Sequence, residues 1–160
     1  MSKKGLEVFM EQINQGVYLV SFDELEKMQG FAKCVDEYRS TCRMTGATPV
    51  TVNDLSSYKA DALHLKILAV KHGDECVGFC GLFKVFYPHL DDYVMGVESL
   101  FIRSTHTGRY WFRLFSAMRT MASRNECKGM ILDAPVNSRF NKLLSLKLRP
   151  LNTSYWCNVK

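Results

Sequence analysis

The sequence predicts a mixed α/β fold, with a single, mostly antiparallel sheet and helices on both of its faces. Residues 64–86 have the pattern of two strands joined by a turn at His72-Gly73-Asp74, and a third strand, Tyr93–Ile102, follows a turn at 88–92. A helical pattern comes next, and the chain then continues as strand, helix, strand. Hairpin strands followed by strands alternating with helices are typical of a mixed sheet covered by helices. At 160 residues the chain is expected to form one domain, residues 1–160.

The N-terminal part predicts a helix, a strand, a second helix and a loop. Apolar residues recur at helical spacing over 6–13, and Gly16 is placed to end that helix. Val17–Val20 predicts a short strand. Residues 44–62 hold glycine, proline, asparagine and serine without a regular period, which predicts a loop of the length that substrate lids often have.

A capping box opens the second helix. Ser21 and Glu24 stand three positions apart, so each side chain can accept a hydrogen bond from the backbone N–H group of the other. The apolar stripe that follows fades near Cys42. Gly30 is expected to interrupt or kink this helix, because a glycine inside a helix costs about 1 kcal/mol.

The C-terminal part predicts two further helices and two strands. Met130–Ala134 predicts a short buried strand, residues 137–147 a last helix, and Leu151–Val159 a closing strand. The helix that follows Gly108 has one apolar face, made of Trp111, Leu114, Phe115, Met118, Met121 and Ala122.

Charge is distributed unevenly along the chain. Residues 1–102 hold 10 Lys and Arg against 14 Asp and Glu, whereas residues 103–160 hold 11 against 2. The cationic C-terminal part favours a polyanion or a multiply phosphorylated cofactor, and a solvated helix face is the alternative. No base-stacking pattern or nucleic-acid motif accompanies this charge, so we do not expect nucleic-acid binding.

Several classes of site are excluded by residue spacing. None of the six cysteines forms a C-x-x-C pair, and the four histidines show no metal-ligand spacing, so no metal site is expected. Cys76 and Cys80 would lie about 13 Å apart along a strand, too far for a disulfide. No apolar run approaches the roughly 20 residues that span a bilayer, and the N-terminus lacks the pattern of a secretion signal. We therefore expect free, buried thiols in a cytoplasmic protein that does not enter membranes.

Residues 97–124 carry the strongest functional signal. An apolar run, Val97–Ile102, passes through a polar turn at 103–107 into Gly108 and a helix. The first N–H groups of a helix have no internal partner, and the helix dipole adds partial positive charge there. A strand that enters a helix through a tight glycine turn therefore predicts a site for the phosphates of a ligand.

From about Lys66 to Lys160, the chain resembles the GNAT superfamily of acyl-CoA-dependent N-acetyltransferases. It looks most like the small GNAT-like proteins that bacteriophages often encode. Three stretches carry the resemblance, in this order: LFIRSTHTGRYWFRLF, CKGMILDAPVNSRFNKLL and PLNTSYWCNVK. The resemblance implies that the family's fourth and fifth strands, here Tyr93–Ile102 and Met130–Ala134, splay apart. The pantetheine arm of acetyl-CoA would lie in the wedge between them.

The family's phosphate turn, Q/R-x-x-G-x-G/A, corresponds here to residues 105–110. Only Gly108 keeps the family residue, so the motif is degenerate. Tyr110 replaces a small residue that lets the backbone approach phosphate, while Arg109 and Arg113 add compensating charge. The resemblance implies that acetyl-CoA is bound by Leu100, Phe101, Ile102, Thr107, Gly108, Arg109, Tyr110, Arg113 and Asn137.

The resemblance also implies two catalytic residues. Glu98 stands where many members keep a general base for the substrate ammonium group, and an ordinary surface glutamate is the alternative. Leu144 replaces a helix tyrosine that protonates the departing thiolate in the family. Tyr155, on the closing strand, is a possible substitute, and a half-buried packing aromatic is its alternative.

Two functions follow from these observations. The first is an acetyl-CoA-dependent N-acyltransferase, in which the amine of a small molecule or protein attacks the thioester directly. The second is a non-catalytic relative without a cofactor, in which Tyr110, Trp111 and Phe112 fill the wedge. Such a protein would be a phage structural component, or an inhibitor that binds a host protein in the host cytoplasm through its basic C-terminal half. Family analogy also allows a homodimer.

Overall fold

The computed structural model describes residues 10–43, 64–133, 142, 144–146 and 148. The 44–62 loop and the closing strand lie outside the described residues, as does most of the predicted last helix. In chain order the elements are β1 (Met10–Asn14), β2 (Val17–Val20), α1 (Phe22–Lys27), α2 (Phe31–Arg43), β3 (Leu65–His72), β4 (Glu75–Tyr87), the 3-10 helix η1 (Pro88–Leu90), β5 (Asp92–Ile102), α4 (Thr107–Arg124) and β6 (Gly129–Ile131).

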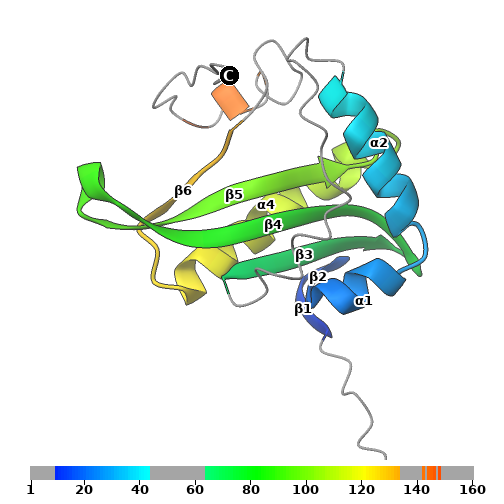
Figure 1. Ribbon diagram of the computed structural model, residues 1–160, viewed down its shortest axis with the longest axis horizontal. Coiled ribbons are helices and arrows are strands. Elements are labelled where there is room, and N and C mark those ends of the chain that lie inside the picture. The colour runs from blue at the N-terminus through cyan, green and yellow to red at the C-terminus, as the bar shows by residue number, and fades with distance from the viewer. Residues whose placement is uncertain (1–9, 44–63, 134–141, 143, 147, 149–160) are drawn as a thin grey trace, which may run out of the picture.

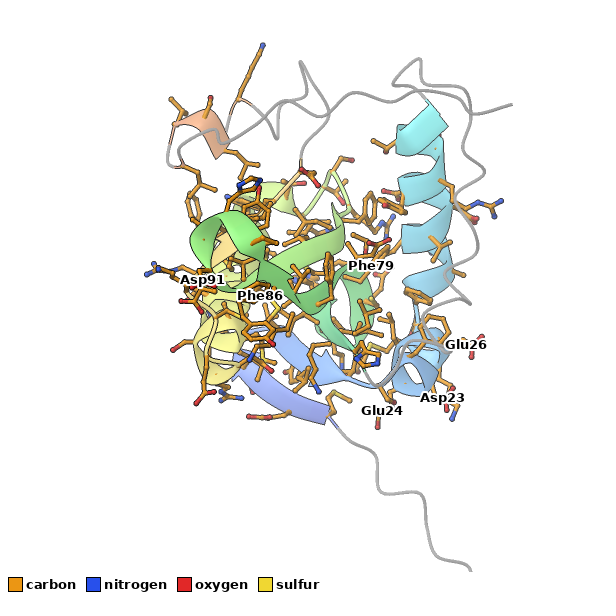
Figure 2. The ribbon with its side chains drawn as sticks, turned by 60° about the vertical axis from the view of Figure 1, so that its left-hand side comes forward. Asp23, Glu24, Glu26, Phe79, Phe86 and Asp91 are labelled. Atoms are coloured by element: carbon orange, nitrogen blue, oxygen red, sulfur yellow. The ribbon has the colours of Figure 1, made fainter. Side chains whose placement is uncertain are left out.

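The six strands form one sheet in the order of the chain, from β1 to β6 (Figure 1). Neighbouring strands from β1 to β5 are antiparallel, and β6 is parallel to β5. Helix α4 covers one face of the sheet, whereas α1 and α2 cover the other (Figure 2). The predicted mixed, mostly antiparallel sheet with helices on both faces is confirmed.

Each face of the sheet buries its own apolar cluster. On the α4 side, Leu114 and Met118 are fully buried in one cluster with Leu82 of β4, which confirms the predicted apolar face of α4. On the opposite side, Phe79 of β4 is 1% exposed and meets Phe31 of α2 edge to face, with ring centroids 5.7 Å apart. The two clusters fix α4 and α2 against opposite faces of the central strands.

The helix predicted over residues 6–13 is wrong in its described part, because Met10–Asn14 forms the edge strand β1. This strand pairs antiparallel with β2 through a tight turn in which Gly16 has a φ of +75°. The backbone hydrogen bonds made with β2 outweigh a weak helical spacing of apolar residues. Gly16 therefore makes the turn of a hairpin instead of ending a helix.

The capping box and the break at Gly30 are confirmed. The Glu24 N–H donates to Ser21 Oγ at 3.3 Å, and the Ser21 N–H donates to Glu24 Oε2 at 3.1 Å. The predicted helix divides into α1 and α2 at Gly30, which has a φ of +88°. A Cβ at Gly30 would lie 2.6 Å from the carbonyl oxygen of Cys76, so glycine allows this turn to approach β4.

One extra residue interrupts the pairing of β5 with β4. Gly81 pairs with Ser99, but the next residue, Leu82, pairs with Val97. Glu98 therefore has no partner across the ladder and forms a β-bulge. The side chain of this bulged residue is exposed.

Strands β5 and β6 pair over a short stretch and then diverge. Only Val94–Gly96 of β5 pairs with Gly129–Ile131 of β6. Beyond this stretch β5 continues to Ile102, and Figure 1 shows β6 turning away from it. Within the described residues, this is the predicted splay between the family's fourth and fifth strands.

Candidate functional site

Helix α4 begins with an open amide end. It starts at Thr107, and its N-cap residue, His106, makes no capping hydrogen bond with its side chain. Gly108 is exposed, and a Cβ added there would meet no atom within 4 Å beyond its chain neighbours and the backbone of its own helix. Within the described part of the chain, the N–H groups of Thr107 and Gly108 make no backbone hydrogen bond. These N–H groups and the helix dipole favour an anion at the predicted position.

Arg103 holds the turn that positions this helix start. Its N–H donates to the Val77 carbonyl at 2.9 Å, and its own carbonyl accepts from the His106 N–H at 2.8 Å. Its guanidinium donates from Nε to Glu37 at 2.8 Å and from Nη1 to Glu75 at 2.9 Å. The bond to Glu37, reinforced by the charge of Glu75, raises the pKa of Arg103. This arginine therefore ties the turn to α2 and β4.

The other basic residues around α4 differ in whether they are paired. Arg124 donates to Glu11 at 2.8 Å, and the Lys128 ammonium lies 3.8 Å from a carboxylate oxygen of Asp92. Within residues 10–43 and 64–133, no carboxylate forms an ion pair with three other arginines. These unpaired arginines are Arg109, Arg113 and Arg119.

The ring of Tyr110 is turned into the core and leaves the space beside Gly108 open. Tyr110 is 4% exposed, and its hydroxyl lies 2.9 Å from Nδ1 of His72. No atom of its ring lies within 4 Å of a Cβ built on Gly108. The guanidinium carbons of Arg109 and Arg113 lie 5.8 Å and 5.4 Å from the ring centroid. The bulk of this residue is thus accommodated inside the protein.

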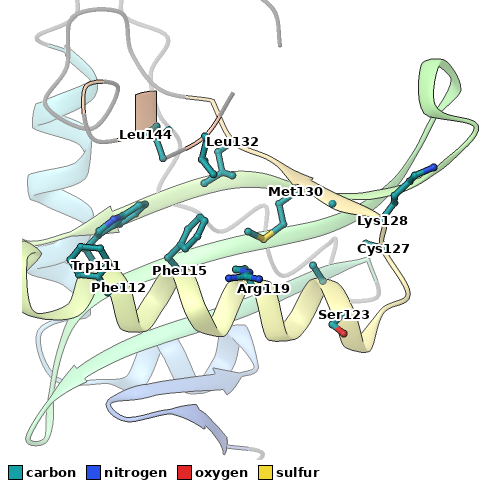
Figure 3. Close-up of a pocket in the computed structure, with 13 residues that line it drawn as sticks. Trp111, Phe112, Phe115, Arg119, Ser123, Cys127, Lys128, Met130, Leu132 and Leu144 are labelled. Carbon is teal, nitrogen blue, oxygen red and sulfur yellow. The ribbon is translucent and has the colours of Figure 1, made fainter. Parts of the chain in front are cut away.

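An apolar pocket of about 630 Å³ lies between α4 and β6 (Figure 3). It begins at Trp111, which is one turn of α4 beyond Gly108. Sequence reasoning placed the aromatic residues of α4 but did not predict the pocket, because the pocket exists only when β6 lies beside the helix. Its lining includes Trp111, Phe115, Arg119, Met130, Leu132 and Leu144.

The predicted cofactor-binding residues of β5 lie beyond the stretch that pairs with β6, where no described strand is hydrogen-bonded to that edge of β5. Leu100 and Ile102 are half-buried against the α4-side cluster. Phe101 faces the opposite cluster, with its ring centroid 5.9 Å from those of Tyr38 and Phe79. The backbone of all three borders the divergence, but their side chains point to two different faces.

Of the two predicted catalytic residues, only Glu98 is described. It lies two residues beyond the last β5 residue that pairs with β6, at the mouth of the divergence. Tyr155 lies outside the described residues, as does the cofactor candidate Asn137, so both remain predictions.

The described residues hold free cysteines and no cluster of metal ligands. Within them, no group of three or more His, Cys, Asp or Glu side chains could hold a metal ion. Cys34, Cys76 and Cys80 are buried free thiols, as predicted, whereas Cys127 is a free thiol that is only partly buried. Burial raises the pKa of the Cys80 thiol, which keeps it protonated and unreactive. No helix of the described part is long and apolar enough to cross a membrane.

No protein-family model matches the chain, and no curated protein matches its sequence. Its structure, in contrast, matches solved acetyltransferases. Ribosomal-protein-alanine N-acetyltransferase from Brucella melitensis biovar Abortus 2308 has a TM-score of 0.66 and 16% identity, with 90% of this chain and 99% of that chain covered. The protein has the GNAT fold.

Two further GNAT-fold structures were solved with ligands. AAC(6')-Iy, in complex with the bisubstrate analogue CoA-S-monomethyl-acetylneamine, has a TM-score of 0.63 and 16% identity, over 90% of this chain and 97% of that one. An aminoglycoside acetyltransferase from an uncultured soil metagenomic sample, in complex with sisomicin, has a TM-score of 0.68 and 9% identity, over 90% and 95%. The similarity to these GNAT enzymes covers nearly the whole of each fold.

Proposed function

We propose that this protein is an acyl-CoA-dependent N-acyltransferase, with acetyl-CoA as its donor and the amine of a small molecule or protein as its acceptor. One observation carries the proposal. The open amide end at Thr107 and Gly108 and the apolar pocket that begins at Trp111 share one helix, beside the divergence of β5 and β6. An acyl-CoA has the matching chemistry, with charged phosphates at one end and an uncharged arm at the other.

The residues present fit each part of such a donor. The N–H groups of Thr107 and Gly108, with the charges of Arg109 and Arg113, would hold the phosphates. The free edge of β5 at Leu100–Ile102 would offer backbone groups to the amides of the arm, as an added strand does. Asn137 is proposed as a further contact to the arm.

The reaction would need three proton transfers, two away from the substrate nitrogen and one to the departing thiolate. The donor supplies a thioester carbonyl, and attack by the amine nitrogen forms a C–N bond while the C–S bond breaks. Glu98, exposed in the bulge at the mouth of the divergence, would accept the proton of the substrate ammonium group. Tyr155 would give a proton to the departing thiolate and would take up the second proton of the nitrogen as the amide forms.

The solved GNAT-fold structures support an acyl-CoA donor and an amine acceptor. One of them holds a CoA-containing bisubstrate analogue, and another holds the amine compound sisomicin. A third is named for the alanine of a ribosomal protein. We therefore propose an aminoglycoside and a peptide with an N-terminal alanine as the first acceptors to test.

Thermal unfolding with and without acetyl-CoA tests donor binding. A ligand present at 100 times its dissociation constant should raise the free energy of unfolding by about 2.7 kcal/mol. The absence of any shift at millimolar acetyl-CoA would contradict the proposal and leave the non-catalytic binding protein as the remaining candidate.

Release of the CoA thiol in the presence of each acceptor tests catalysis. Glu98→Gln should keep the acetyl-CoA-induced shift and lower kcat by about 100-fold or more, as loss of a general base does. Glu26→Gln, at an exposed glutamate of α1, is the matched control and should leave both readouts unchanged. An unchanged kcat in Glu98→Gln would remove this residue from the mechanism.

A further inference from the structure

We propose that Tyr110 is a positioning residue for phosphate binding, because its buried ring holds the guanidinium groups of Arg109 and Arg113 beside the open start of α4. The proposal rests on the function proposed above and deepens it. It gives a role to a bulky residue at a place where a small one would let the backbone approach phosphate.

The ring of Tyr110 is fixed by three separate elements. Its backbone belongs to the first turn of α4, and its hydroxyl lies 2.9 Å from Nδ1 of His72, the last residue of β3. On the side of the β1–β2 turn, a Cβ added to Gly16 would lie only 2.9 Å from Cε1 of the ring. Such close packing restricts the ring to this orientation.

Two cations lie against this fixed ring. The guanidinium carbons of Arg109 and Arg113 are 5.8 Å and 5.4 Å from its centroid, within the range of a cation–π interaction. The two arginines are four residues apart, so they share one face of the helix. No carboxylate of the described residues forms an ion pair with either. The ring therefore orients both side chains without neutralising their charge.

The contrast with Arg103 shows why this arrangement suits a ligand. The guanidinium of Arg103 is already occupied by two carboxylates, at 2.8 Å and 2.9 Å. Arg109 and Arg113 keep their N–H donors for an incoming group, and guanidinium donors match phosphate oxygens in pairs. Arg109 also follows Gly108 directly, so its charge adds to that of the free N–H groups of the helix start.

Because the ring holds two long side chains in place before the ligand arrives, less side-chain entropy is lost on binding. Each mobile side chain ordered at an interface weakens affinity, and for two of them the effect is about 10-fold in Kd. The ring should therefore matter for ligands that carry phosphates and should not matter for the pantetheine arm alone.

The test measures the Kd of CoA and of pantetheine by titration calorimetry for wild type, Tyr110→Leu and Tyr110→Phe. Tyr110→Leu should weaken CoA binding about 10-fold and leave pantetheine binding within about twofold. Tyr110→Phe keeps the ring and should bind CoA within about threefold of wild type. Tyr18→Leu is the matched control, because it removes a ring 5.6 Å from the Lys71 ammonium on the opposite face of the sheet, and it should change neither Kd.

Arg109→Gln and Arg113→Gln keep the proposal testable if Tyr110→Leu does not fold. Each should weaken CoA binding and reduce its dependence on salt, and in the Tyr110→Leu background each should have a smaller effect than in wild type. Equal CoA affinity in Tyr110→Leu and wild type, or equal losses for CoA and pantetheine, would overturn the positioning role while donor binding stands. A wild-type protein that binds neither compound would overturn the proposed function itself.

Discussion

A glutamate at position 108 should make the protein more stable and its donor affinity weaker. Gly108 lies within α4, is exposed and has open space around its missing Cβ, so a larger side chain fits without strain. Replacing an exposed helical glycine and placing a carboxylate at a helix start are each favourable, and together they should add about 1 kcal/mol to the free energy of unfolding. For a chain of this size the melting temperature should rise by about 2 to 4 °C.

The same carboxylate would face the phosphates of the donor. Two like charges about 5 Å apart repel by roughly 3 kcal/mol at an effective dielectric constant of about 20, and salt reduces this value. We expect Gly108→Glu to weaken acetyl-CoA binding by about 10- to 100-fold in a calorimetric titration.

Gly108→Gln is the control, because it has the same shape and helix preference without the charge. It should gain part of the stability and lose much less affinity than Gly108→Glu. Equal donor affinity in the Glu and Gln variants would refute the reasoning, since it would show that the phosphates do not bind at this helix start.

Arg103→Met removes both carboxylate bonds of the turn before α4 and should lower the free energy of unfolding, measured by urea titration, by about 1 kcal/mol. Arg124→Met, at an exposed ion pair, is the control and should lower it by under about 0.5 kcal/mol. Equal costs would show that the turn does not depend on Arg103. Phe79→Ala should lower the free energy of unfolding by about 3 to 5 kcal/mol, since Phe79 is 1% exposed, while Phe86→Ala, at a residue 46% exposed on the hairpin, should cost under about 1 kcal/mol (Figure 2 labels both). Burial raises the pKa of the Cys80 thiol, so above about pH 9 the unfolded chain releases this proton and the native chain keeps it. The free energy of unfolding should therefore fall by up to about 1.4 kcal/mol per pH unit in that range. Cys80→Ala should make this fall less steep, and an unchanged slope would contradict the role of Cys80.

Much of the fold could be predicted because short segments specify it locally. The turn at Gly73, which has a φ of +61°, joins two strands that pair along their length with one register shift, at Val77. The capping box at Ser21 and the break at Gly30 are likewise properties of a few adjacent residues. Strand β1 was missed because nothing within Met10–Asn14 distinguishes an edge strand from a helix. Its conformation depends on hydrogen bonds to β2.

The candidate site was predicted less completely because it depends on contacts between distant residues. The helix start at Gly108 follows from local order, and the structure confirms it. Which arginines form ion pairs does not follow from local order, because the partners are distant in the sequence. Arg103 pairs with Glu37, which is 66 positions away, and Arg124 pairs with Glu11, which is 113 positions away. The inward turn of Tyr110 likewise needs the distant His72. The sequence indicates an excess of positive charge, but only the fold decides which charges remain for a ligand.

The bulge at Glu98 also determines to which face of the sheet each following side chain of β5 points. The β5 side chains that pack toward α4 include Val97, Leu100 and Ile102. In a strand without a bulge, Val97 and Leu100 would point to opposite faces, because they are three positions apart. If β5 kept Glu98 but ran without the bulge, strict alternation from Val97 would direct Ser99 and Phe101 to the α4 side and Leu100 to the other. Deleting Glu98 would instead remove the bulge and keep the observed directions. Sequence comparisons of this strand therefore need a one-residue gap opposite any relative that lacks the insertion, because an ungapped comparison would pair inward positions with outward ones.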